Sequence, residues 1–368
     1  MTRTDILIVG AGIAGTGLAA ALGGRRDVMV IEREARPGHH STGRSAAIFI
    51  QNYGNAVIRT LSAASRPLFD APDPGFFPQP LLSARGILFV ADAQDLDEHR
   101  DLLGESQGLV PLSAEEAVAM VPLLRPERIA EAAYERDASD IDVNALHQGW
   151  LRMARQAGTK LLTNAALISA HRSGDGWQVD TTAGGIEARF IVNASGAWAD
   201  VVARACGAAP LGLVPMRRSM AVIACPSGYD CRDWPLISNS ADRWYAKPDA
   251  GRLMISPSEE DPVEPHDAFV DDMALAEGLD RYQEAVRAEV THLETSWAGL
   301  RTFAPDRTPV VGFDPGVEGF FWLAGQGGYG IQTAPAMSRV AAAALLDDPL
   351  EPPLAAALAA MSPSRLRR

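Results

Sequence analysis

A glycine turn close to the N-terminus constrains the fold of this chain more than any other feature. An apolar run at 6–9 leads into three glycines with the spacing GxGxxG, namely Gly10, Gly12 and Gly15. In a strand–turn–helix unit the first glycine permits the tight turn, the second lets the backbone approach a pyrophosphate, and the third lets the helix pack against the strand. The sequence therefore predicts a helix over 13–22 whose N-terminus binds phosphate.

The segment after this turn completes a dinucleotide-binding unit. A second apolar run, 28–31, ends at Glu32, where a carboxylate can accept hydrogen bonds from both hydroxyls of a ribose. The loop 36–47 follows and contains HSTGRSAA, whose hydroxyl and guanidinium donors suit phosphate. Together these features predict a Rossmann-like βαβ unit.

Two later segments repeat the strand–glycine–helix pattern. VNASGAWAD surrounds residue 195, and GQGGYGIQT surrounds residue 327. With the first turn they place three glycine-rich loops at the C-terminal ends of strands, which is the edge where an open α/β sheet binds its ligand. A helix is also predicted over 273–293, in a region that we expect to form a second domain.

Composition argues against several classes of protein. The 368 residues are enough for about two domains. The net charge of -13 argues against binding to nucleic acid or anionic membranes, which require a concentrated positive surface. We find no apolar stretch long enough for a transmembrane segment and no room for a signal peptide before the first strand, so we expect a cytoplasmic protein. The three cysteines show no metal-ligand spacing, so no metal is expected.

These motifs together resemble the FAD-dependent amine and D-amino-acid oxidoreductases, a family that includes glycine oxidase, sarcosine oxidase and small bacterial D-amino-acid dehydrogenases. The resemblance extends over essentially the whole chain and rests on VGAGIAG with Glu32, HSTGRSAA, VNASGAWAD and GQGGYGIQT. Within the family the chain is most similar to D-arginine dehydrogenase, through ALHQGW, PLGLVPMRRS, KPDAG and SWAGLRTF.

The resemblance implies an α/β enzyme with two domains. A Rossmann-like FAD-binding domain would be assembled from the separate segments 1–80, 141–210 and 295–368. A mixed-sheet, α+β substrate domain would comprise 81–140 and 211–294 and cover the flavin.

The resemblance also implies the cofactor contacts. The glycine turn would contact the pyrophosphate, Glu32 the adenosine ribose, and Leu167 the adenine through its backbone. The loop 327–333 would lie along the isoalloxazine and offer N–H groups to its O2 edge. No cysteine lies near SWAGLRTF or GQGGYG, so we expect FAD to bind noncovalently. The predicted cofactor residues are Gly10, Gly12, Ile13, Ala14, Gly15, Glu32, Arg33, Ser41, Thr42, Arg44, Ser45, Ala46, Ala47, Leu167, Ser195, Gly196, Trp198, Gly327, Gly328, Tyr329, Gly330, Ile331, Gln332 and Thr333.

An amino-acid oxidoreductase must hold the substrate carboxylate, a task that suits arginine because its planar guanidinium forms two parallel hydrogen bonds. The resemblance implies this role for Arg218 and Arg301. It also places Tyr53 and Tyr245 in the pocket and Gln332 next to the flavin or the substrate amine. We expect no obligatory side-chain base. The predicted substrate-pocket lining is Ile48, Ile50, Ile87, Gly299 and Gly328.

Two positions depart from the D-arginine dehydrogenase pattern. Ile87 replaces an acidic side chain and Ile48 replaces a histidine. A substrate guanidinium without its acidic partner would lose on the order of several kcal/mol. We therefore expect D-amino acids with apolar side chains rather than D-Arg. The predicted reaction is oxidative deamination at CH–NH2 to a 2-oxo acid and ammonia, with hydride transfer from Cα to flavin N5.

Other interpretations stay open on the sequence alone. One is an oxidase or dehydrogenase of glycine, sarcosine, another secondary amine or a 2-hydroxy acid. Another is a flavin-binding assembly protein without catalysis. The electron acceptor, oxygen or a quinone-type partner, is also open.

Overall fold

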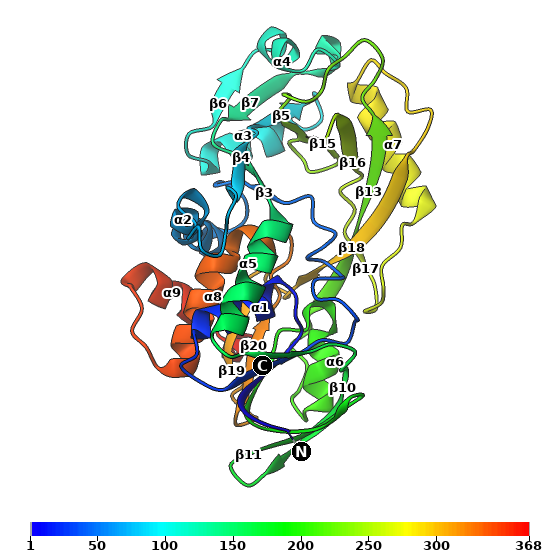
Figure 1. The fold of residues 1–368 in the computed structure, drawn as a ribbon. Helices are drawn as coiled ribbons and strands as arrows, with labels where there is room; N and C mark the ends of the chain where they lie inside the picture. Colours follow the sequence, from blue (N-terminus) through cyan, green and yellow to red (C-terminus); the bar gives the residue numbers. More distant parts are fainter. Residues whose placement is uncertain (1, 368) are drawn as a thin grey trace.

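The N-terminal strand lies inside an eight-stranded sheet, between two parallel neighbours. The structure is a computed structural model that describes residues 2–367 (Figure 1). Strand β1 (Thr2–Val9) pairs with β2 (Val28–Ile31) and with β12 (Gly184–Asn193), and β12 pairs in parallel with β20 (Phe320–Ala324). The three strands that precede the glycine loops are thus parallel neighbours, so the predicted alignment of the loops at one sheet edge is confirmed. The other strands are β9 (Lys160–Leu162), β10 (Leu167–Ser173), β11 (Gly176–Thr181) and β19 (Val310–Phe313).

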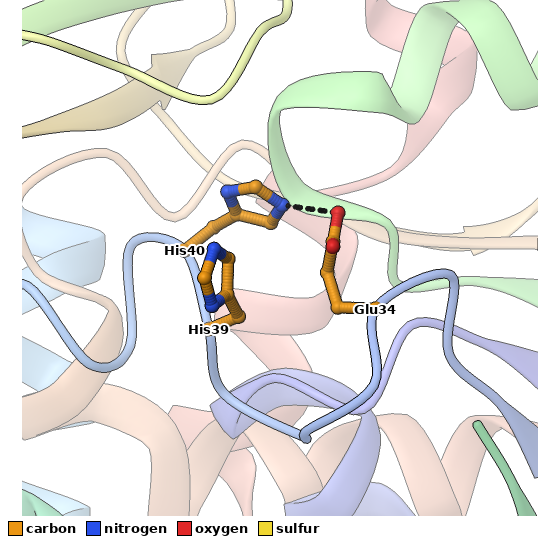
Figure 2. Close-up of side chains that lie close together, drawn as sticks. All are labelled: Glu34, His39 and His40. Carbon is orange, nitrogen blue, oxygen red and sulfur yellow. Dashed lines mark hydrogen bonds and ion pairs between the residues drawn. The ribbon is translucent and has the colours of Figure 1, made fainter. Parts of the chain in front are cut away.

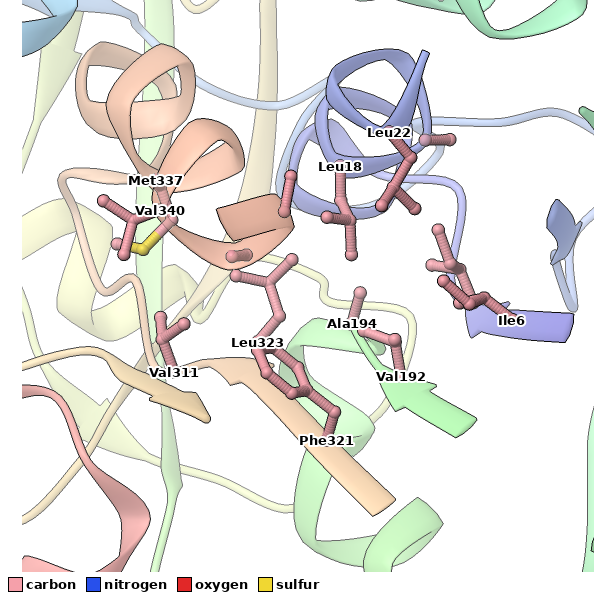
Figure 3. Packing of buried hydrophobic residues seen from close by; sticks show 14 of the residues in the cluster. Ile6, Leu18, Leu22, Val192, Ala194, Val311, Phe321, Leu323, Met337 and Val340 are labelled. Atoms are coloured by element: carbon pink, nitrogen blue, oxygen red, sulfur yellow. The ribbon is translucent and has the colours of Figure 1, made fainter. Parts of the chain in front are cut away.

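Alternating side chains of this sheet fill two cores. On one face Ile6, Val192 and Phe321 pack against helices α1 (Ile13–Leu22) and α8 (Gly330–Leu346) (Figure 3). On the other face Leu7 and its neighbours pack against α6 (Ala199–Ala205). Burial on both faces explains why these strands are continuously apolar. The remaining helices of this half are α2 (Ala56–Asp70), α5 (Val143–Gln156), α9 (Pro352–Ala360), and the short 3-10 turns η2 (Gly196–Trp198) and η3 (Pro363–Leu366).

A nine-stranded mixed sheet forms the other half of the molecule (Figure 1). Most neighbouring strands are antiparallel, but β14 and β5 are parallel, as a mixed-sheet substrate domain requires. The strands are β5 (Ile87–Ala91), β6 (Val110–Leu112), β7 (Glu131–Glu135), β13 (Val214–Ala224), β14 (Leu236–Asn239), β15 (Tyr245–Asp249), β16 (Arg252–Ser256), β17 (Asp261–Pro262) and β18 (Thr295–Phe303). The helices are α3 (Leu96–Glu105), α4 (Ala114–Met120), α7 (Asp272–Ala285) and the 3-10 turn η1 (Pro126–Arg128).

Two expectations about this half are wrong. Strand β18, expected among the FAD-binding segments, belongs to the nine-stranded sheet because it forms a continuous antiparallel ladder with β13. Helix α7 ends at Ala285 instead of Leu293. The next residue, Val286, is fully buried and forms an extended bridge with Leu124, which interrupts the helix.

A three-stranded sheet lies where the chain passes between the two halves (Figure 1). Its strands are β3 (Ile48–Phe49), β4 (Leu82–Ala84) and β8 (Ser139–Ile141). Because β3 directly follows the loop 36–47, this sheet fixes the end of that loop. None of the helices between residues 2 and 367 has both the length and the apolar character of a membrane-crossing segment.

Candidate active site

Three neighbouring cavities lie along the edge of the first sheet where the glycine loops gather. The first cavity, about 210 Å³, extends from Glu32 to Trp198. The central cavity, about 140 Å³, shares Gly12 and Thr42 with the first. The outer cavity, about 210 Å³, shares Arg301 and other residues with the central one. The series runs from Glu32 past Gly12 and Thr42 to Arg301, the arrangement expected for a dinucleotide with a substrate at its end.

The N-terminal glycine turn has the geometry that the sequence predicted. Gly10 has φ +107°, and a Cβ there would lie 2.5 Å from Ala194 O. A Cβ at Gly12 would meet only Thr42 Oγ1, at 3.2 Å, so the turn is open toward the cavities. A Cβ at Gly15 would lie 2.0 Å from Gly10 O. Gly15 therefore has the predicted packing geometry. It lines none of the three cavities, and its pyrophosphate contact stays a prediction.

Glu32 lies at the first cavity, at the end of β2. Its carboxylate accepts hydrogen bonds from the N–H of Ala11 at 2.9 Å and of Glu34 at 3.0 Å. Arg33 stacks 4.6 Å over the ring of Trp198, and both residues line the cavity with Leu167. The predicted adenosine residues are therefore brought together, and their contacts with adenosine stay a prediction.

A cluster of two histidines and a glutamate borders the first cavity and was missed by sequence reasoning. Ligand atoms of Glu34, His39 and His40 lie within 4.8 Å of one another. Figure 2 shows the His40 ring directed at Glu34, with Nε2 3.0 Å from Oε1. Asp267 lies 3.6 Å from His39 and 3.7 Å from His40. Each ring thus has a carboxylate partner, and these pairs account for the cluster without an ion.

The loop 41–47 connects the two halves through its side chains. Ser41 Oγ donates to Leu300 O at 2.6 Å, and Thr42 Oγ1 accepts from the N–H of Ile13 at 3.0 Å. The Arg44 guanidinium pairs with Asp267 and donates to the carbonyls of Ala268 and Ala298. The guanidinium is thus engaged by the second half, although Arg44 also lines the central cavity, and its phosphate role stays a prediction. Ser45 and Ala46 line both the central and outer cavities, and Ala47 lines the outer one.

The C-terminal glycine loop agrees only in part with prediction. Gly327, Gly328, Gly330 and Ile331 line the central cavity. Gly330 already begins helix α8, so the segment 330–333 is a helical turn and not a loop. Helix N-termini carry N–H groups without intrahelical partners, which suits the anionic edge of a reduced flavin.

Three residues of this segment have other roles than predicted. Tyr329 is buried between Tyr53 and Phe303, and Thr333 is fully buried, with its hydroxyl donating to Tyr329 O. Gln332 reaches the outer cavity, but its amide is engaged by the backbone of Ile50 and by a serine hydroxyl. Gln332 therefore positions the turn 50–53 and has no free donor for a substrate.

Arg301 is the prominent charged group where the central and outer cavities meet. No group in residues 2–367 forms a hydrogen bond or ion pair with its guanidinium. A Cβ at Gly328 would lie 3.0 Å from Arg301 Nη1, so glycine there keeps space beside the guanidinium. Burial opposes the charge, but the combined influence of Tyr53, Tyr245 and the carboxylates of Asp242 and Glu260 outweighs it and raises the pKa of Arg301. Burial also raises the pKa of Tyr53 to about 12, so its phenol stays protonated and can donate.

Arg218 differs from Arg301 because it has acidic partners. Its Nη2 lies 3.2 Å from Glu260 Oε1 and 3.6 Å from Asp242 Oδ2. The guanidinium lines both the central and outer cavities, and its Nε and Nη1 are buried without a partner. Of the two arginines predicted to bind a carboxylate, Arg301 is thus the one whose guanidinium has no ion-pair partner among residues 2–367.

The outer cavity has an apolar wall and a polar rim. The predicted Ile48, Ile50 and Ile87 lie in the wall, whereas Gly299 lines the central cavity instead. Sequence reasoning missed several lining residues because no motif contains them. They are Asn52, Phe89, Leu102, Leu236, Ser238, Asn239, Ser240 and Asp242.

The residues around the first and central cavities fit FAD. The N-terminus of α1 opens between them, and Gly12 and Gly196 present backbone to the cavity where a side chain would occupy space. Within the described chain no cysteine lines the three cavities, so the residues favour noncovalent binding.

Comparison with curated proteins gives distant relatives, two of which match about nine-tenths of this chain. Glycine oxidase of Geobacillus kaustophilus is 24% identical over 359 residues, which cover 90% of each chain. Human dimethylglycine dehydrogenase is 25% identical over 363 residues, 89% of this chain and 41% of that protein. The chain also spans 36% of FAD-dependent oxidoreductase domain-containing protein 1 of Xenopus laevis, with 29% identity over 187 residues, 44% of this chain. It therefore spans less than half the length of the latter two proteins.

Solved structures share the fold, and a family model assigns the chain. The glycine oxidase of Geobacillus kaustophilus superposes with a TM-score of 0.81 over 95% of this chain and 96% of its own, at 24% identity. L-proline dehydrogenase from P. horikoshii superposes with a TM-score of 0.85 over 100% and 98%, at 20% identity. The model described as "DAO: FAD dependent oxidoreductase" matches residues 5–344. The chain therefore belongs to the DAO family of FAD-dependent oxidoreductases, with FAD as its cofactor.

Proposed function

We propose that this enzyme oxidises D-amino acids with uncharged, largely apolar side chains to 2-oxo acids and ammonia. The observation that carries the proposal is the unpaired guanidinium of Arg301, which lies between the central cavity and a cavity with an apolar wall. A partly buried cation without a protein partner favours a bound anion, and a carboxylate matches the planar guanidinium.

Each part of the site has a distinct task in this proposal. Arg301 binds the substrate carboxylate, Tyr53 donates a hydrogen bond to it, and the isoleucine wall receives the side chain. FAD, when bound, supplies the two-electron acceptor. The protein orients Cα–H toward the flavin and excludes water from the reacting centre. Most of the protein's contribution to the rate arises from this orientation. The amine enters unprotonated, and water hydrolyses the imino acid that is formed.

Small or N-methylated amino acids are the second candidate class. The names of the relatives, glycine oxidase and dimethylglycine dehydrogenase, support it. The outer cavity favours larger side chains, because about 210 Å³ beside Arg301 exceeds what glycine needs. The D configuration and the identity of the electron acceptor rest on the sequence resemblance.

Anaerobic reduction of the bound flavin by a substrate panel tests the proposal. The panel contains D-Leu, D-Met, D-Phe, D-Val, their L enantiomers, D-Arg, glycine, sarcosine and lactate, and the readout is the loss of flavin absorbance. We expect fastest reduction by the apolar D-amino acids. Faster reduction by D-Arg, by glycine or by sarcosine would overturn the substrate class, and no reduction by any compound would favour a non-catalytic protein. Admission of air then reports whether oxygen reoxidises the flavin.

A further inference from the structure

A buried lysine supports the loop that separates the central and outer cavities. Lys247 on β15 is 6% exposed, whereas Lys160, the other lysine of the chain, lies on the surface. The Lys247 ammonium donates to Ala46 O at 2.6 Å and lies 3.4 Å from Ala47 O. It also lies 2.9 Å from Asp140 Oδ1. The cation is therefore committed to the backbone of a predicted cofactor loop.

The lysine belongs to a cluster with an unbalanced charge. Asp140 also binds Arg85, through Nε at 2.8 Å and Nη2 at 2.7 Å. One carboxylate thus lies between two cations, which leaves a net charge of about +1 beneath the loop. Desolvating an ammonium is costly even with a partner, so stability alone is a poor reason for a lysine at this position.

The Lys247 ammonium contacts the loop at a strained backbone turn. Ala47 has φ +28°, a region that residues with a side chain seldom adopt. Both Ala46 and Ala47 line the outer cavity, and Ala46 also lines the central one. Tyr245 and Lys247 are two residues apart on β15 and therefore point to the same face of the strand. One strand thus contributes a wall of the substrate cavity and the support of the cofactor loop.

We propose that Lys247 is a positioning residue for FAD and that its cluster with Arg85 and Asp140 favours flavin reduction. The hydrogen bonds to Ala46 and Ala47 hold the strained turn in the shape that contacts the cofactor. The uncompensated positive charge stabilises the negative charge that the flavin gains on reduction. This inference rests on FAD as the cofactor and is independent of which amine is the substrate.

The test compares Lys247→Met with Lys160→Met, a control that removes the same charge from the surface. The readouts are the FAD dissociation constant of the deflavinated protein and the midpoint potential of the bound flavin. We expect Lys247→Met to weaken FAD binding about tenfold or more, as the loss of one charged hydrogen bond implies, and to lower the potential. Lys160→Met should change neither quantity.

A second variant separates charge from loop geometry. Arg85→Met reduces the charge of the cluster while Lys247 still contacts the loop, so it should lower the flavin potential with little effect on FAD affinity. If Lys247→Met and Arg85→Met only lower the melting temperature and leave both flavin quantities unchanged, the cluster is merely structural and the proposal is wrong. If Lys247→Met does not fold, an unchanged potential in Arg85→Met overturns the charge effect, and a lowered one supports it.

Discussion

Replacing Arg301 by methionine tests the central step of the functional proposal. The guanidinium has no partner within residues 2–367, so all of its available donors are free for the substrate. Removing one member of a buried ion pair costs about 3–5 kcal/mol. Because Arg301 is only partly buried, the lower limit applies, which corresponds to a loss of about a hundredfold in catalytic efficiency.

Anaerobic stopped-flow reduction of the flavin by D-Leu measures the loss of catalytic efficiency directly. The ratio of the limiting reduction rate to the substrate dissociation constant should fall about a hundredfold in Arg301→Met. Arg301→Lys keeps the charge but loses the two-pronged geometry, so it should recover part of the loss. Arg339→Met, which removes an exposed arginine from α8, is the control and should behave like the parent enzyme.

The effect must depend on the substrate carboxylate. An amine that lacks this group, such as 3-methylbutylamine in place of leucine, cannot use Arg301 and should be oxidised equally slowly by the parent and by Arg301→Met. If Arg301→Met loses less than about tenfold with D-Leu, or loses as much with the amine, Arg301 does not bind the carboxylate.

Three further predictions concern the side-chain wall, the contact between the halves, and pH. Ile87→Glu introduces an acid into the outer cavity and should raise the ratio of kcat/KM for D-Arg to that for D-Leu at least about tenfold. An unchanged ratio would show that residue 87 does not face the substrate side chain. Arg44 holds the pKa of the Asp267 carboxyl low, and Asp267→Asn weakens this contact. The variant should release FAD several-fold faster in a fluorescence assay. An unchanged release rate would show that the Arg44–Asp267 contact does not help to retain FAD. Burial lowers the pKa of His147, so the unfolded chain binds the proton more readily and stability falls as pH drops below about 6.5. His147→Gln should therefore flatten the slope of the unfolding free energy against pH between pH 5 and 7. Equal slopes in the variant and the parent would show that His147 does not cause this pH dependence.

The cofactor half could be predicted because its signals are local. The tight turn at Gly10 and the close packing at Gly15 are backbone requirements that only glycine meets, and the flanking strands are short apolar runs on either side. Three copies of the same pattern predicted that the loops after β1, β12 and β20 gather at one edge of the sheet. Local chemistry and spacing were sufficient for these features.

The errors share a dependence on distant partners. The pairing of Arg44 with Asp267, 223 residues away, could not be read from its motif. The amide of Gln332 is engaged by Ile50, 282 residues away. Helix α7 ends early because Val286 pairs with Leu124. Sequence motifs describe a residue's neighbours along the chain and carry no information on such pairings.

The charges around the outer cavity bear on the proposed preference against D-Arg, in addition to the two isoleucines. Asp242 lies in the cavity lining and could be taken as a replacement for the acid absent at Ile87. However, Asp242 lies 3.6 Å from Arg218, so its charge already faces a cation. The lining of this cavity contains two guanidiniums, Arg218 and Arg301, and the carboxylate of Asp242, while Glu260 pairs with Arg218. We therefore expect a substrate guanidinium to be disfavoured, because it would compete with Arg218 for Asp242 and lie near the cation of Arg301, whereas a zwitterion with a neutral side chain supplies a carboxylate for Arg301.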